Sequence, residues 1–104
     1  MTLAQVAEKV HGTILVPADG EIEAFYAGDF LSRVMGRAPA GCAWFTVMAN
    51  VNVAGVAVLA EVRAVVLCEG VSPDPLLVEK LKGEGIGLIA TACPVFEACA
   101  GVVT

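Results

Sequence analysis

The feature that most constrains the fold is a regular alternation in the second half of the chain. Three short apolar runs are each followed by a segment with helix-forming character. Continuous apolar runs are typical of strands buried on both faces, and such alternation favours parallel strands joined by right-handed crossovers. The sequence therefore predicts a βαβαβα order, with strands at 42–48, 64–68 and 87–91 and helices at 53–62, 73–83 and 95–103.

The first half adds flanking elements to this unit. Thr2 and Gln5 have the spacing of a capping box and predict a helix over 3–10. Strands are expected at 13–16 and 21–27, and Asp29 is expected to cap a short helix that ends at Gly36. The predicted fold class is α/β: a single compact domain over 1–104, with a mainly parallel sheet covered by helices.

Two other helix starts carry cap residues. Asn50 and Asn52 are candidate caps for the helix at 53–62. Ser72 followed by Pro73 has the arrangement favoured at the start of the helix at 73–83.

The composition narrows the environment and the partners. Hydrophobic residues make up 58% of the chain and charged residues only 16%, which is below the usual share of about 25%. The most apolar run, 53–60, is too short to span a bilayer and is interrupted at Gly55, so no membrane partner is expected. The N-terminus lacks the pattern of a secretory signal, which predicts a cytoplasmic location. A net charge of −5 argues against nucleic acid.

The helix predicted at 53–62 has no adequate polar stripe. A surface helix normally shows one, so we expect a second copy of the chain to cover the outer face of this helix. The alternative is burial inside one chain. The residues expected at a homodimer interface are Val53, Val56, Val58, Leu59, Phe30 and Leu31.

No catalytic constellation is visible. The run Gly83–Gly87 (GEGIG) follows a helix and opens a strand, the reverse of a dinucleotide-binding loop, so it predicts a turn. No phosphate-binding kinase loop or nucleophile–base pair is present, and His11 is expected to lie on the surface. We therefore expect a protein that is not an enzyme.

The carboxyl ends of parallel strands are the preferred ligand sites of open α/β sheets. Helix N-termini at the same edge favour an anion. We expect a small anionic ligand or a partner protein there and no cofactor. The candidate ligand-binding residues are Asn50, Asn52, Cys68, Glu69, Gly70, Ser72, Thr91 and Cys93.

The four cysteines allow an alternative. None belongs to a C-x-x-C pair, and free cysteine is among the most buried residue types, so packing is the simpler interpretation. Cys68 and Cys93, however, end strands that can be neighbours. If a metal or redox role exists, these two thiols are the candidates, because both lie at strand ends.

The segments GDFLSRVM, AWFTVMANVNVAGVAVLAEVRAVVLCEG and DPLLVEKLKGEGIGLIATACPVFEA resemble the DRTGG domain. This family is related to the N-terminal domain of the bacterial phosphocarrier-protein kinase/phosphorylase. The resemblance runs from about Ala24 to the C-terminus. The Asp-Arg-Thr-Gly-Gly string itself is absent, and CEGVSPDP occupies its region.

The resemblance implies an α/β regulatory or accessory domain without a kinase site of its own, and dimer formation through the domain. Some stand-alone members are encoded beside iron–sulfur hydrogenase components. The alternative function is therefore a redox or metal accessory protein that uses Cys68 and Cys93, with an unknown metal or an iron–sulfur cluster in a partner.

Overall fold

The predicted order of elements is confirmed. The computed structural model describes residues 1–104 as five helices and five strands. In chain order these are α1 (Leu3–Lys9), β1 (Thr13–Val16), β2 (Ala24–Ala27), α2 (Leu31–Arg37), β3 (Cys42–Thr46), α3 (Asn52–Leu59), β4 (Ala64–Leu67), α4 (Pro75–Gly83), β5 (Gly87–Ala90) and α5 (Val95–Val103).

The strands form one mainly parallel sheet in the order β1-β5-β4-β3-β2. The pairs β2–β3, β3–β4 and β4–β5 are parallel, and β1 pairs antiparallel with β5. The antiparallel pair places Thr13 opposite Ala90. The start of β1 therefore lies at the edge where the parallel strands end, and this brings the turn after α1 to that edge.

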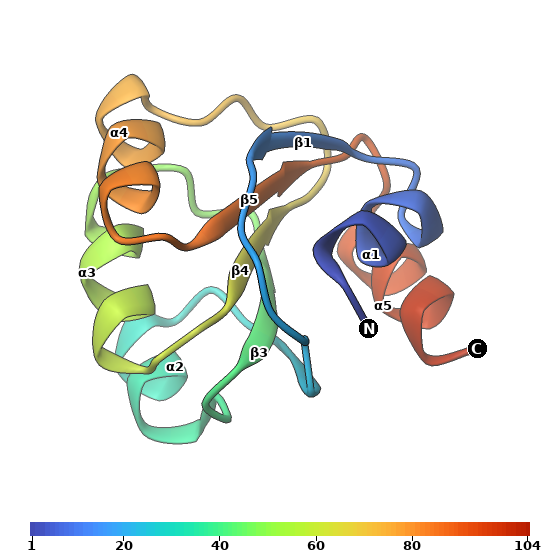
Figure 1. The fold of residues 1–104 in the computed structure, drawn as a ribbon, viewed down its shortest axis with the longest axis horizontal. Coiled ribbons are helices and arrows are strands. Elements are labelled where there is room, and N and C mark those ends of the chain that lie inside the picture. The colour runs from blue at the N-terminus through green and yellow to red at the C-terminus, as the bar shows by residue number, and fades with distance from the viewer.

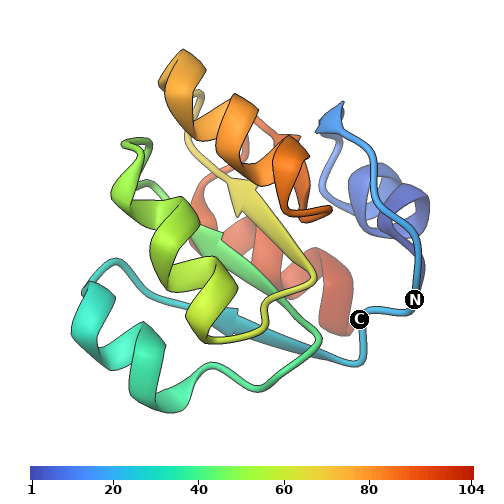
Figure 2. The ribbon, with the colours of Figure 1, turned by 60° about the vertical axis from the view of Figure 1, so that its left-hand side comes forward.

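Helices cover both faces of the sheet (Figure 1). Trp44 and Val65 belong to the core cluster that includes residues of α2, α3 and α4, whereas Phe45 and Val66 belong to the cluster that includes residues of α1 and α5. Successive strand residues point to opposite faces, so the fully apolar strands supply both cores. Figure 2 shows α2, α3 and α4 side by side on one face.

Three expected helix caps are wrong. Asn52 is the first residue of α3 rather than its cap, and its amide donates to Asn50 Oδ1. The carboxylate of Asp29 does not cap α2 but accepts hydrogen bonds from Thr46 Oγ1 at 2.7 Å and Val47 N at 2.9 Å. For α4, Asp74 rather than Ser72 is the N-cap, with Oδ1 accepting from Leu76 N, and Pro75 rather than Pro73 opens the helix. The side chain of Asp29 instead ties the end of β2 to the end of β3.

The apolar helix α3 is covered on its inner side by its own chain. It packs against the sheet and against α2 and α4. Val53 and Val56 lie in the core and cannot meet a second chain, so their assignment to an interface is wrong. On the outer side, Val58 and Leu59 are 40% and 72% exposed.

Three helices end in the same turn. The amides of His11 and Gly12 donate to Glu8 O and Ala7 O, which is the Schellman pattern. The same pattern follows α3 with Glu61, and follows α4 with Gly85, at the left-handed position. Glycine favours this conformation, so His11, at φ 53°, holds a position where a Cβ atom costs energy.

Candidate functional site: a cavity at the carboxyl edge of the sheet

Backbone hydrogen bonds join the loops that follow the parallel strands. Asp74 N donates to Ala49 O at 2.9 Å and links the loops after β3 and β4. Glu69 N donates to Cys93 O at 2.9 Å, and Gly70 N donates to Thr91 O at 3.0 Å. Together with Asp29, these bonds make the carboxyl edge one continuous surface.

The structure brings the predicted residues to this edge but gives them different surroundings. The exposed residues are Asn50, Asn52, Glu69, Gly70 and Ser72, and Cys93 is half-buried. The side chain of Asn50 accepts from Asn52 N at 2.9 Å and so supports the start of α3. Thr91 is buried, and its hydroxyl donates to Val10 O.

Cys68 is a core residue, so its assignment as a ligand-binding residue is wrong. Its side chain is fully buried in the cluster with α1 and α5, and Sγ donates to Val66 O at 3.6 Å. Burial raises the pKa of the Cys68 thiol to about 12, with smaller contributions from Cys99 and Cys93. A neutral buried thiol is a poor nucleophile and a poor metal ligand.

The thiols do not assemble a metal centre in this arrangement. No three side chains among the His, Cys, Asp and Glu residues are grouped so that they could hold a metal ion. The geometry therefore gives no support to the alternative in which Cys68 and Cys93 bind a metal.

A cavity of about 380 Å³ opens at the β1 end of the carboxyl edge. Gly70, Ser72 and Thr91, which were predicted as site residues, line it. Sequence reasoning missed His11, Thr13 and Leu15, because only the antiparallel pairing of β1 with β5 brings this side of the cavity there. It also left out four lining residues at or after the ends of β4 and β5, namely Val71, Pro73, Ala90 and Ala92.

This cavity differs from the other four in the charged residues of its lining. Its lining contains no carboxylate, although the chain carries a net charge of −5. Each of the four other cavities includes at least one Asp or Glu. His11, the single histidine of the chain, is the only lining residue whose side chain can become a cation. The cavity is thus the one best suited to accept an anion.

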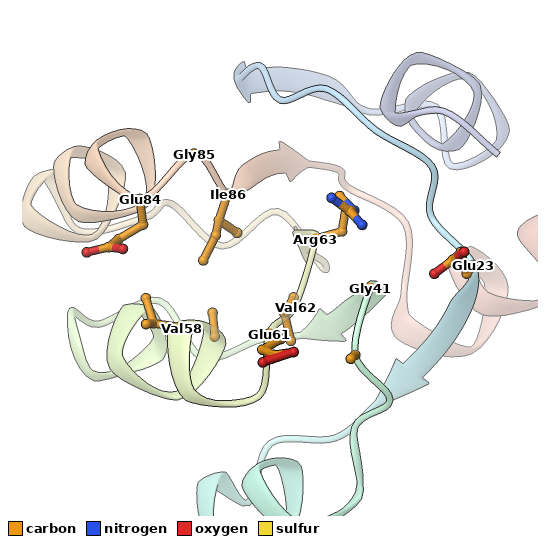
Figure 3. A pocket seen from close by; sticks show the side chains of 11 residues that line it. Glu23, Gly41, Val58, Glu61, Val62, Arg63, Glu84, Gly85 and Ile86 are labelled. Carbon is orange, nitrogen blue, oxygen red and sulfur yellow. The ribbon is translucent and has the colours of Figure 1, made fainter.

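A cavity of about 480 Å³ lies at the opposite, amino edge of the sheet (Figure 3). Val58 and Ile86 point toward one another across it, and three glutamates, Glu23, Glu61 and Glu84, are among its lining residues. Arg63 also lines it, but Arg63 Nε donates to Glu21 O at 3.1 Å and ties the loop before β2 to the loop before β4. The excess of carboxylates opposes an anionic ligand at this edge.

The comparisons with known proteins agree with the fold. No protein-family model matches the chain, and no curated protein matches it. A solved structure is similar: the CBS and DRTGG domains of the regulatory region of Clostridium perfringens pyrophosphatase, complexed with activator, diadenosine tetraphosphate. The TM-score is 0.78 at 14% identity, over 98% of this chain.

This chain spans 46% of the length of that structure, so less than half of the regulatory region is represented. At this identity the likeness shows the fold alone, a fold like that of the CBS and DRTGG region. The sequence resemblance to the DRTGG domain implies an α/β fold, and the likeness agrees with that fold class. The structure contains no helix of the length and hydropathy required to cross a membrane.

Proposed function

We propose that this chain is a regulatory or accessory domain that works by binding, without catalysis, at the carboxyl edge of its sheet. The observation that carries the proposal is the cavity beside β1, which combines three predicted site residues with a lining free of carboxylates. Carboxyl edges of parallel sheets are the usual ligand sites of such folds. A small anionic ligand suits the cavity at this edge better than it suits any other cavity of the chain.

The similar structure supports the same class of function. It is part of a regulatory region, and its activator, diadenosine tetraphosphate, is a small anion. Activation by that compound belongs to the pyrophosphatase, of which this chain covers less than half. For this chain we carry over only the class, namely a domain that responds to a bound small molecule.

The lining of the cavity also supports a role without turnover. General acid–base or nucleophilic catalysis needs paired groups within hydrogen-bond reach. Here His11 has no carboxylate or thiol beside it in the lining. The proposal therefore assigns binding, and not chemistry, to this cavity.

We further propose that the domain forms a homodimer through the outer faces of α2 and α3. Phe30 is 66% exposed and Leu59 is 72% exposed, and Leu31 is half-buried beside Phe30. Covering apolar side chains of this size with a second copy removes them from water, which stabilises the dimer by about 25 cal/mol per Å² of apolar surface.

A cytoplasmic location stays a prediction.

Titration calorimetry with diadenosine tetraphosphate, ATP and AMP, run beside an assay for phosphate release, tests the function. We expect at least one of these nucleotides to bind and none to be consumed. Nucleotide turnover that is abolished by Glu69→Gln, in protein that remains folded, would contradict a non-catalytic role. Glu69 is exposed at the same edge, so its replacement leaves the core intact.

A further inference from the structure

We propose that His11, Ser72 and Ala92 form an oxyanion-binding subsite in the cavity beside β1, and that His11 determines its preference for anions. The ligand class is a small molecule with one carboxylate or phosphate group and a short apolar body. This inference rests on the proposed function, because it names the chemistry of the same cavity.

Hydrogen-bond donors without partners lie along this cavity. The backbone amides of Ser72 and Ala92 donate to no group of the protein. The hydroxyls of Ser72 and Thr13 also have no partner within the chain. Backbone amides that lack a protein acceptor are satisfied by water or by a ligand, and an oxyanion can accept from several donors at once.

The electrostatic surroundings favour an anion over a cation. The imidazole of His11 is the only cation-forming group of the lining. The nearest carboxylates along the chain are Asp74, next to Pro73, Glu69, next to Gly70, and Glu8, three residues before His11, and none of them belongs to the lining. Asp74 Oδ1 instead accepts from Leu76 N at the start of α4. An oxyanion can therefore approach the donors without direct contact with a carboxylate.

The position of His11 is set by the end of α1. Its amide donates to Glu8 O at 3.2 Å, and the next amide, of Gly12, donates to Ala7 O at 2.8 Å. These bonds hold His11 in the left-handed conformation, at φ 53°. The carbonyl of Val10 accepts from Thr91 Oγ1, so the turn is also fixed to the end of β5. The imidazole is thus carried by a rigid turn.

The size and walls of the cavity limit the ligand. A volume of about 380 Å³ lies at the small end of ligand sites, which span roughly 300–1,000 Å³. Leu15, Val71 and Ala90 supply apolar wall. A short aliphatic carboxylate and a small phosphate share the required chemistry, so both serve as probes.

Amide chemical-shift titration of the isotope-labelled full chain tests the subsite, with inorganic phosphate, pyrophosphate and butyrate as separate probes. The variants are His11→Gly and Ser72→Ala. The matched control is Glu61→Gly, which places glycine at the same position of the Schellman turn after α3, at the opposite edge. His11→Gly relieves the turn, so folding of the variant is expected.

We expect at least one probe to shift the amides of Ser72 and Ala92. His11→Gly should weaken the binding of that probe roughly tenfold or more, because the variant loses one hydrogen bond to a charged group. Glu61→Gly should leave the affinity for the probe unchanged. Phosphate binding without butyrate binding, or the reverse, identifies the headgroup and supports the subsite.

Absence of binding by all three probes at millimolar concentration would overturn the subsite, and so would equal affinity in the wild type and His11→Gly. If a nucleotide still binds in calorimetry and shifts amides elsewhere on the carboxyl edge, the proposed regulatory function stands and only this subsite is lost. If neither nucleotides nor the probes bind, both proposals fail.

Discussion

The Thr91 hydroxyl donates a 2.6 Å hydrogen bond to the carbonyl of Val10, a residue 81 positions earlier in the chain. The same oxygen accepts from Cys93 N at 3.1 Å. Thr91 is only 5% exposed, and its bond to Val10 is buried, whereas the bond from Cys93 N is partly buried. They fix the end of α1 against the end of β5, and so hold the turn that contributes His11 to the lining of the cavity.

Replacement of Thr91 by valine keeps the shape of the side chain and removes both hydrogen bonds. The Val10 carbonyl and the Cys93 amide then lose their partner, so we expect the free energy of unfolding to fall by about 1–3 kcal/mol. Urea unfolding followed by circular dichroism measures the change. Thr13→Val, at an exposed hydroxyl, is the control and should stay within about 0.5 kcal/mol of wild type. Equal stability of the Thr91 and Thr13 variants would refute this role.

The thiols should differ in reactivity. Burial raises the pKa of Cys42 to about 11 and that of Cys68 to about 12, whereas Cys93 is half-buried at the loop after β5. Because the thiolate is the nucleophile, alkylation of native protein should modify Cys93 long before Cys68 or Cys42. Mass spectrometry of a time course with iodoacetamide gives the order. Early modification of Cys68 would show that its environment opens.

The same thiols predict a loss of stability in alkali. Their pKa values are raised above the ordinary 9.0 in the folded state, so the folded chain keeps protons that the unfolded chain releases. The free energy of unfolding should therefore decrease as the pH rises from 9 toward 11. The double variant Cys42→Ala/Cys68→Ala should show a weaker dependence on pH. An unchanged pH profile in that variant would assign the loss to other groups.

The homodimer predicts a mass of two chains in light scattering at micromolar concentration. Leu59→Glu should shift the protein toward the monomer, because it places a charge on the outer face of α3, where Leu59 is 72% exposed. Val103→Glu is the control, since Val103 is 69% exposed on α5, in the other helical layer. A monomeric wild type would contradict the homodimer. Equal dissociation of the dimer in Leu59→Glu and Val103→Glu would show that the outer face of α3 does not form its interface.

Glycine at the left-handed turn positions should stabilise the fold. His11 and Glu61 have φ of 53° and 57°, where a Cβ atom costs about 1–2 kcal/mol. The greater freedom of glycine in the unfolded chain offsets part of this gain. We expect His11→Gly and Glu61→Gly each to raise the midpoint of thermal unfolding. A lower midpoint for His11→Gly alone would show that its side chain stabilises the turn.

Much of the fold could be predicted because the local signals and the packing agree. The apolar runs around Trp44, Val66 and Ile89 are buried strands, as their lack of polar residues indicates. The caps were harder, because Asp29, Ser72 and Asp74 all have cap chemistry. Only the position of Thr46 shows that Asp29 bonds across the sheet.

The candidate site could be predicted in part. The parallel strand ends identified Gly70, Ser72 and Thr91. They could not identify His11, because a four-residue strand such as β1 gives no indication of its direction in the sheet. The same limit applies to Cys68, whose place at a strand end does not reveal which face of the sheet its side chain enters.

Chemical-shift mapping of the amides during titration with inorganic phosphate and with AMP, each of which carries a single phosphate group, tests the central claim, binding at the carboxyl edge, most directly. The account predicts that the largest shifts fall on Gly70, Ser72 and Thr91, with no consumption of the AMP. Shifts confined to the amino-edge cavity, at Gly41, Arg63 and Gly85, would contradict it.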